Sequence, residues 1–176
     1  QVGHRQSVDL DFFTTEKTFE SIKLERELLS TGKWQTKFSE DGTVFGEILG
    51  AKISFIAYPF FYPALPALEF GKVSMLRPAD IAVMKIIALS QRGKKRDFID
   101  LYWYVKNREP ITDIIRRVLK QYPGQEHNIP HFLKSLTYFA DAESEPMPNL
   151  NFTVTWPEVK KFFQVDAVWA TRELVL

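Results

Sequence analysis

Residues 7–13 read Ser7-Val8-Asp9-Leu10-Asp11-Phe12-Phe13, an alternation of apolar and acidic side chains with a period of two residues. This period predicts a β-strand, in which residues two positions apart project from the same face. Asp9 and Asp11 therefore point to one side, and Val8, Leu10 and Phe12 are expected to pack behind them. Two adjacent carboxylates repel each other unless a cation lies between them, so the pair is a candidate site for Mg²⁺ or Mn²⁺. Solvated strand faces also carry this pattern without any metal, so the tripeptide alone leaves a purely structural role open.

The overall composition is that of an ordinary water-exposed protein. The chain has 176 residues, enough for one domain or for one domain with a small helical extension. Its net charge is +1, so no global field attracts nucleic acid or a membrane surface, and any basic site must be local. It contains no cysteine, which excludes disulfides and thiolate chemistry. No apolar run reaches the length of a membrane span and no signal-peptide pattern is present, so the cytoplasm is the expected location.

Periodicity and turn residues predict a sheet region followed by helices. A helix is expected over residues 16–29, with Thr14-Thr15 and Gly32 at its ends and Phe19, Ile22 and Leu29 toward the core. The other expected elements are strands at 34–38, 43–49, 51–58 and 69–75, a turn at Asp41-Gly42, and helices at 79–91, from residue 96, and at 112–122, 130–139 and 157–163. A loop is expected over 141–149, and the pattern after residue 165 is ambiguous.

A second group of charged residues lies between residues 85 and 100. The helix predicted over 79–91 is apolar almost all round, and Lys85 and Arg92, seven residues apart, are expected to share one of its faces. Asp97 and Asp100 are three residues apart on the next helix and also share a face. A lysine within an apolar helix needs a carboxylate or a phosphate for its ammonium group. Two alternatives are open: an ion-pair network of Lys85 and Arg96 with the two aspartates, or a phosphate-binding site.

Taken together, the two groups resemble a known family. The first reads Gly3-His4-Arg5-x-Ser7-x-Asp9-x-Asp11-Phe12-Phe13, and the second reads Lys85-x-x-Ala88-Leu89-x-x-Arg92-Gly93-x-x-Arg96-Asp97-x-x-Asp100-Leu101. This combination resembles the AbiEii/AbiGii toxin family, nucleotidyltransferase-like toxins of bacterial abortive-infection and type IV toxin–antitoxin systems. Residues 135–143 and 156–163 resemble the tail of one branch of that family, so the likeness spans most of the chain.

The resemblance implies an α+β fold, with a nucleotidyltransferase-like mixed β-sheet flanked by helices and a helical C-terminal part. The sheet region would occupy residues 1–76, and the helical region at 77–176 would complete an active-site cleft. The implied partners are a nucleoside triphosphate as donor substrate, RNA as acceptor, and a cognate antitoxin encoded alongside. No membrane is implied.

The resemblance also implies roles for individual residues. Asp9 and Asp11 would bind the divalent metal, Mg²⁺ or Mn²⁺, and would act in catalysis together with Lys85 and Asp97. Lys85 would contact the triphosphate as a compact point charge, and Asp97 would orient Lys85 or take part in proton transfer. The implied nucleotide- and phosphate-binding residues are Ser7, Arg5, Lys85, Arg92 and Arg96, with Asp100 in a supporting role.

Two features depart from the family pattern. The Gly-rich turn that cradles the triphosphate would lie upstream of Gln1, so the chain is expected to be a fragment whose first strand has an open edge. Many nucleotidyltransferases carry a third carboxylate on a neighbouring strand, where this chain has Ser54. Serine is a poor Mg²⁺ ligand, so either two carboxylates suffice, or another acid such as Glu47 substitutes, or catalysis is weakened.

Three hypotheses follow from these patterns. The leading one is an enzyme that transfers a nucleotidyl group, and the alternative is a catalytically weakened nucleotide-binding or partner-binding module on the same fold. The third is a structural domain whose acids and bases only pair with one another. The histidines His4, His127 and His131 form no metal-ligand spacing, and His4 is expected at the surface, with a contact to substrate as the alternative.

Overall fold

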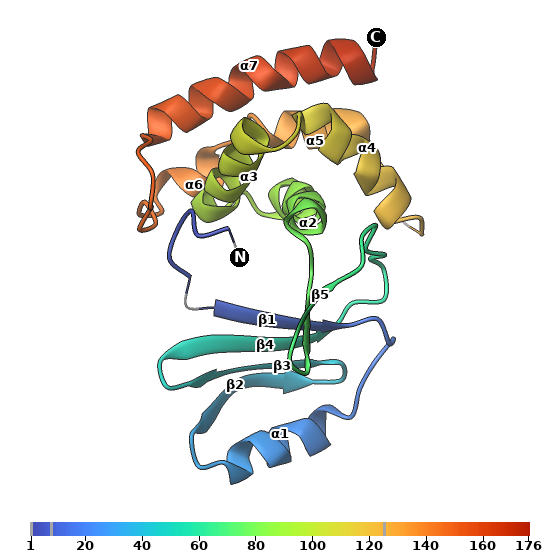
Figure 1. Cartoon of the computed structure of the whole chain (residues 1–176), viewed down its shortest axis with the longest axis vertical. Helices are drawn as coiled ribbons and strands as arrows, with labels where there is room; N and C mark the ends of the chain where they lie inside the picture. Colours follow the sequence, from blue (N-terminus) through green and yellow to red (C-terminus); the bar gives the residue numbers. More distant parts are fainter. Residues whose placement is uncertain (1, 8, 125) are drawn as a thin grey trace. The chain divides into compact units, whose positions relative to one another are not determined.

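The computed structural model describes residues 2–7, 9–124 and 126–176. Within it the chain forms two compact units, Ser7–Phe61 and the combination of Gln1–Gln6 with Tyr62–Leu176. The first unit holds the main sheet and one helix, and the second holds a short hairpin and the remaining helices (Figure 1). The fold is α+β with a helical C-terminal part, as predicted. The functional division after residue 76 stays a prediction.

The main sheet contains β1 (Asp9–Thr14), β2 (Trp34–Glu40), β3 (Thr43–Ile48) and β4 (Ala51–Ala57) in the order β1-β4-β3-β2. Strand β1 runs parallel to β4, whereas the other two pairs are antiparallel, so the sheet is mixed. The predicted turn between β2 and β3 is confirmed, with Gly42 at φ 71°, a left-handed conformation that glycine adopts without strain. Among the described strands β1 has one neighbour, so it lies at the sheet edge, as expected.

Helix α1 (Ser21–Ser30) begins later than predicted. The hydroxyl of Thr14 accepts a hydrogen bond from the Glu16 amide and that of Thr18 donates to the Asp41 carboxylate, which holds residues 15–20 as a loop. The inward-facing residues of α1 include Ser21, Leu24 and Leu28. The prediction for Ile22 and Leu29 was therefore wrong, because these side chains are 75% and 50% exposed. Gly32 follows the helix with φ 69°, as predicted.

One face of the sheet carries aromatic side chains. The Phe12 and Phe55 rings stack with their centroids 5.1 Å apart, and Trp34 packs on Phe55 at 6.2 Å. Leu10 was expected to join Phe12 behind the aspartates, but its side chain is 53% exposed, because the aromatic cluster lies farther along the strand. The same expectation for Val8 lies outside the described residues.

The second unit opens with a hairpin where a single strand was predicted. Strands β5 (Leu68–Phe70) and β6 (Val73–Met75) are antiparallel, and Gly71 between them has φ 62°. The helices that follow are α2 (Pro78–Gln91), α3 (Lys95–Asn107), α4 (Ile111–Gln121), α5 (Ile129–Ser135), α6 (Ala140–Glu143) and α7 (Trp156–Leu174). Pro78 occupies the first turn of α2, as predicted, because its missing N–H is not needed there.

The C-terminal helices differ most from the predictions. Helix α5 ends at Ser135, and α6 forms inside the stretch predicted as a loop. Helix α7 extends through the tail to Leu174, because a capping box between Thr155 and Glu158 starts it and its inner face is buried. The Phe98 ring packs at 5.1 Å on Phe139 and at 5.6 Å on Phe163, which fixes this region on α3. In the described chain, no helix is both long and apolar enough to cross a lipid bilayer.

Candidate functional site

One candidate site, within the sheet unit, is the acidic face of β1. Asp9 and Asp11 lie two residues apart in the strand and share a face, with Asp9 half-buried and Asp11 exposed. In the register with β4, Asp11 lies opposite Ser54 and Asp9 opposite Lys52. The Ser54 hydroxyl donates a hydrogen bond to the Asp11 carboxylate. This face offers the oxygen ligands that Mg²⁺ or Mn²⁺ prefers, and Mg²⁺ completes its shell with water and substrate phosphates.

Among the residues that the structure describes, no third carboxylate joins this pair. Glu47 lies on β3 opposite Lys52, so the register inserts a lysine between Asp9 and Glu47. Two strand spacings, about 10 Å, separate the backbones of β1 and β3. Across the part of the chain that the structure describes, no three or more His, Cys, Asp or Glu side chains gather closely enough to hold a metal ion. A metal at β1 would therefore depend on Asp9, Asp11 and ligands from the substrate.

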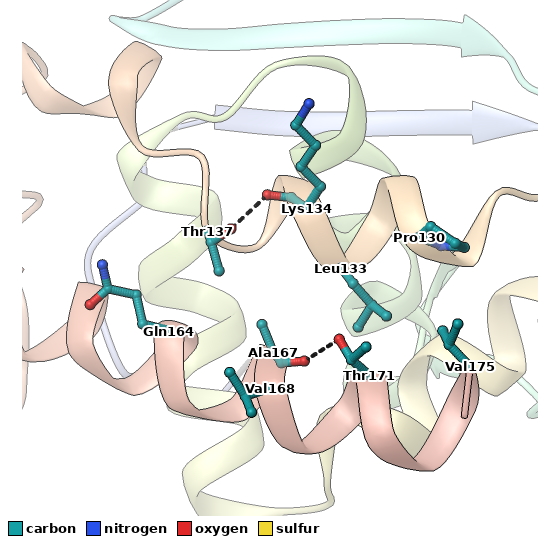
Figure 2. A pocket seen from close by; sticks show the side chains of 9 residues that line it. All are labelled: Pro130, Leu133, Lys134, Thr137, Gln164, Ala167, Val168, Thr171 and Val175. Atoms are coloured by element: carbon teal, nitrogen blue, oxygen red, sulfur yellow. Dashed lines mark hydrogen bonds between the residues drawn. The ribbon is translucent and has the colours of Figure 1, made fainter.

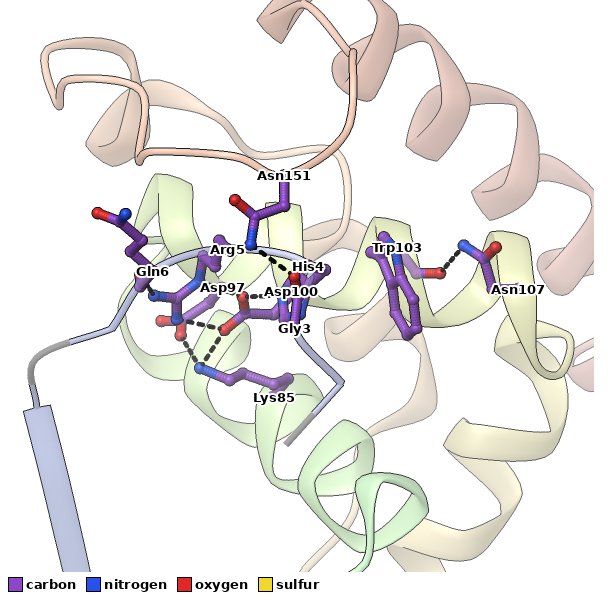
Figure 3. Close-up of polar contacts among 10 residues, drawn as sticks. All are labelled: Gly3, His4, Arg5, Gln6, Lys85, Asp97, Asp100, Trp103, Asn107 and Asn151. Atoms are coloured by element: carbon purple, nitrogen blue, oxygen red, sulfur yellow. Dashed lines mark hydrogen bonds and ion pairs between the residues drawn. The ribbon is translucent and has the colours of Figure 1, made fainter.

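A separate candidate site, within the helical unit, is a charged cluster (Figure 3). The Lys85 ammonium on α2 lies 2.6 Å from Oδ1 of Asp97 and 2.9 Å from Oδ2 of Asp100, both on α3. The Asp97 side chain is only 3% exposed, and its Oδ2 has no hydrogen-bond partner among the described residues. The two aspartates thus share a face, and Lys85 reaches both of them from the neighbouring helix.

Asp100 has further partners on the segment before β1 (Figure 3). Arg5 donates from Nε to Oδ1 at 2.5 Å and from Nη2 to Oδ2 at 2.8 Å, a two-pronged ion pair. The His4 Nε2 atom lies 2.7 Å from Oδ1 of Asp100, and its ring stacks on Trp103 with centroids 5.2 Å apart. The expectation that His4 is a surface residue was wrong, because its side chain is 15% exposed and committed to these contacts.

Burial and charge oppose each other in this cluster. Burial would raise the pKa of the Asp100 carboxyl, but hydrogen bonds from Arg5 and His4 and the charge of Lys85 outweigh it, so this pKa lies well below its usual range. Burial would lower the pKa of Lys85, but the carboxylates of Asp100 and Asp97 outweigh it and raise this pKa. Both residues are therefore charged at neutral pH.

Three further residues predicted for the site, Arg92, Arg96 and Ser7, differ in their exposure and secondary structure. Arg92 stands just past α2 in an extended conformation, φ −155° and ψ 108°, with its side chain exposed. The prediction that it shares a helix face with Lys85 was wrong, because α2 ends at Gln91 and Arg92 follows it in an extended conformation. Arg96 lies half-buried in the first turn of α3, and Ser7 is exposed just before β1.

Sequence reasoning missed the roles of His4 and Asn151. The Asn151 side chain donates to the carbonyl of Gly3 at 2.7 Å, a contact between residues 148 positions apart. The basic run before β1 was a usable signal for His4, because a histidine beside an arginine suits a buried carboxylate. No local pattern could indicate Asn151.

A hollow elsewhere on the helical unit lies between α5 and α7 (Figure 2). Its volume is about 310 Å³, and its lining consists of Pro130, Leu133, Lys134, Thr137, Gln164, Ala167, Val168, Thr171 and Val175. Lys134 is the one charged residue in this lining. The hollow therefore holds no pair of groups suited to acid–base or metal chemistry.

One comparison with known proteins identifies a family. The profile described as "Nucleotidyl transferase AbiEii toxin, Type IV TA system" matches residues 32–167, a span that includes Lys85, Asp97 and Asp100 but begins after Asp11. An uncharacterized protein of Aquifex aeolicus (strain VF5), aq_aa25, is 34% identical over 167 residues, which cover 92% of this chain and 78% of that protein. No solved structure matches the chain.

Proposed function

Because this chain belongs to the AbiEii family of nucleotidyl transferase toxins, we propose that it transfers a nucleotidyl group from a nucleoside triphosphate to RNA in a metal-dependent reaction. An acceptor hydroxyl attacks the α-phosphorus and pyrophosphate leaves. The modification of RNA arrests growth in the cytoplasm, and a cognate antitoxin opposes it. The matching family is a toxin family of type IV toxin–antitoxin systems, which supports the antitoxin partner.

The observation that carries this proposal is the pair Asp9 and Asp11 on one face of β1. Their carboxylates, with the Ser54 hydroxyl beside Asp11, form an oxygen-rich site suited to a hard divalent cation. A cation bound there would neutralise charge on the triphosphate. The two aspartates hold this cation, and Ser7 just ahead of the strand contributes a hydroxyl to the phosphates.

Lys85 acts as the phosphate contact in this proposal. Its ammonium group has three N–H donors, and Asp97 and Asp100 each accept from it, so one donor stays available to a phosphate oxygen. Asp97 is buried and bonded to Lys85 through Oδ1, which suits the role of orienting the ammonium group. Arg92 and Arg96 add positive charge for the phosphates or for the RNA backbone.

The second candidate function is a nucleotide-binding module with weakened catalysis. Ser54 favours it, because this hydroxyl lies opposite Asp11 where a third carboxylate would complete a metal site. Such a module would bind a nucleoside triphosphate with metal, and the melting temperature would rise with ligand concentration. It would not transfer label from that nucleotide to RNA.

The test compares the wild-type chain with the double variant Asp9→Ala, Asp11→Ala. Each of the four nucleoside triphosphates, labelled in the α-phosphate, is incubated with total RNA and Mg²⁺ or Mn²⁺, and titration calorimetry measures metal–nucleotide affinity. Transfer and binding by the wild type, with loss of both in the double variant, are expected. The control removes two exposed acids elsewhere, Asp113→Ala with Asp141→Ala, and should change neither.

The outcomes separate the candidates. Binding without transfer supports the weakened module. Unchanged metal–nucleotide affinity in the Asp9→Ala, Asp11→Ala variant would contradict the assigned metal site.

A further inference from the structure

A row of side chains crosses the four strands of the main sheet on the face that carries the acidic pair. The register places one residue of each strand in this row (Figure 1): Asp11, Ser54, Phe45 and Phe38. Residues directly opposite each other in paired strands project from the same face. Two contacts agree with this, because the Ser54 hydroxyl donates to the Asp11 carboxylate, and the centroids of the Phe45 and Phe38 rings lie 5.7 Å apart. The row therefore joins the candidate metal site to a pair of aromatic rings within the unit Ser7–Phe61.

A β-bulge in β2 decides which side of the sheet Phe38 faces. The register shifts between Thr36 and Phe38, so two residues of β2, Lys37 and Phe38, oppose the single residue Phe45 of β3. Under strict alternation Phe38 would share the inner face with Thr36 and Trp34, where Trp34 is 5% exposed and donates to the Thr36 hydroxyl. The bulge instead turns the Phe38 ring to the side of Phe45. Bulges often re-aim a side chain in this way next to an active site.

Both rings are exposed to solvent, although phenylalanine is usually buried. Phe38 is 44% exposed and Phe45 is 38% exposed. The neighbours of Phe45 along β3, Val44 and Gly46, are buried on the other face. The two ring planes are tilted by only 31°, so the rings together offer one wider aromatic surface. Adjacent exposed apolar residues, unlike single ones, indicate an interaction site.

The spacing between the acidic pair and the rings fits a nucleotide. The backbones of β1 and β3 lie two strand spacings apart, about 10 Å. The strand between them, β4, contributes the small side chain of Ser54 to the row and the exposed Lys52 opposite Asp9. If the phosphates bind a metal held by Asp9 and Asp11, the ribose lies over Ser54 and the base reaches the rings. Lys52 adds positive charge for the phosphates on the same face.

We propose that Phe38 and Phe45 form a stacking platform for the base of the donor nucleoside triphosphate. This inference rests on the proposed function, because the metal at Asp9 and Asp11 holds the phosphates of the same nucleotide. The platform binds the π-face that every nucleobase has, so it accepts all four nucleotides and holds the larger purines more tightly. A base of the acceptor RNA is the other occupant, which the experiment separates.

The experiment measures binding to the full chain by calorimetry at saturating Mn²⁺. The three probes are inorganic triphosphate, non-hydrolysable analogues of the four nucleoside triphosphates, and a short single-stranded RNA. The variants are Phe38→Ile, Phe45→Ile, both changes together, and Phe45→Trp. Isoleucine keeps an apolar, strand-forming side chain but removes the ring. Phe70→Ile is the matched control, because Phe70 lies in β5, outside the main sheet, and is 74% exposed.

The platform predicts that only probes with a base respond to the variants. Each isoleucine variant should weaken binding of the nucleotide analogues, and the double variant should weaken it about 10-fold, the loss expected for one stacked base. The loss should be larger for the ATP and GTP analogues than for the CTP and UTP analogues. Affinity for inorganic triphosphate should stay unchanged. Phe45→Trp should retain nucleotide affinity, because it keeps an aromatic face, and Phe70→Ile should change no value.

Other results would overturn the platform. If the double variant binds triphosphate and all analogues like the wild type, the rings do not stack on the base, while the proposed function stands. Loss of RNA binding with unchanged nucleotide affinity would assign the rings to the acceptor RNA instead. Equal weakening of triphosphate and analogues, together with a lower melting temperature, would make the rings a purely structural pair. If the wild type binds neither triphosphate nor nucleotide, both the platform and the proposed function fail. Should the double variant not fold, the two single isoleucine variants carry the same comparison.

Discussion

The Lys85 ammonium group pairs with both Asp97 and Asp100. Replacing Lys85 should lower the stability of the fold and abolish nucleotide binding, and a second variant tells these two effects apart. In Lys85→Met, the 3%-exposed Asp97 side chain loses the ammonium group 2.6 Å away, which should cost about 3–5 kcal/mol of unfolding free energy. The paired variant Lys85→Met with Asp97→Asn also removes the carboxylate that has lost its ammonium partner. It should therefore recover much of the lost unfolding free energy. Both variants should fail to bind nucleotide, as measured by urea unfolding and titration calorimetry.

The paired variant distinguishes the two explanations for Lys85. If it folds and binds nucleotide like the wild type, Lys85 has a purely structural role. If it folds and does not bind, the loss cannot be attributed to unfolding.

Asp100 should make stability depend on pH at the acid end. Its carboxyl has a lower pKa folded than unfolded, because Arg5, His4 and Lys85 outweigh the effect of burial. Its contribution is therefore complete above the ordinary pKa of 3.8 and is lost as the pH falls through the lower folded pKa. The difference in unfolding free energy between wild type and Asp100→Asn should be constant near neutrality and shrink below about pH 4. Urea unfolding at stepwise lower pH measures it, and a constant difference in strong acid would count against the prediction.

At the level of the strands, Gly46 is the position that allows β2 and β3 to pack. A Cβ added there would lie 2.2 Å from the Trp34 ring and 2.6 Å from the Gln35 carbonyl oxygen. Trp34 is 5% exposed and donates to the Thr36 hydroxyl at 3.0 Å, so the ring has little freedom to move away. Gly46→Ala should therefore lower the unfolding free energy by about 1–3 kcal/mol.

Thermal unfolding of Gly46→Ala provides the measurement, with Gly124→Ala as the control, because a Cβ there meets nothing within 4 Å. Equal melting temperatures for the two variants would mean that Trp34 can shift without cost.

Across the whole molecule, the two units should differ in stability. Of the buried apolar side chains in the described part of the chain, only Trp34, Val44 and Phe61 belong to Ser7–Phe61, and the others belong to the helical unit. Opening of the sheet unit therefore exposes less buried apolar surface than opening of the helices. Amides of α2, α3 and α4 should exchange more slowly than those of β1 to β4, and metal with nucleotide should slow exchange in β1. Hydrogen exchange with mass spectrometry tests this, and equal protection of both units would refute it.

Local sequence patterns were sufficient to predict most strands of the sheet and the start of the first helix of the helical part. Alternation, the Asp41-Gly42 turn and Pro78 each act over a few residues, and the corresponding strands and helix start were confirmed. The same local pattern could not predict the end of α7. Three apolar side chains on that helix are exposed and obscure its helical period: Val165, Val168 and Trp169. The predicted start of α1 was wrong because the Thr18 hydroxyl donates a hydrogen bond to Asp41, 23 positions away, which no local pattern indicates.

The sequence by itself determined the chemistry that this protein can offer: two carboxylates two residues apart in a strand, and a lysine within a largely apolar helix. Only the tertiary structure decided which charges meet. It brought His4 and Arg5 to Asp100, about 95 positions later, and left Arg92 exposed beyond the end of its helix. The physical reason is that strand and helix periodicity are set by neighbours along the chain, whereas a buried ion pair forms only where packing brings distant side chains together and excludes water.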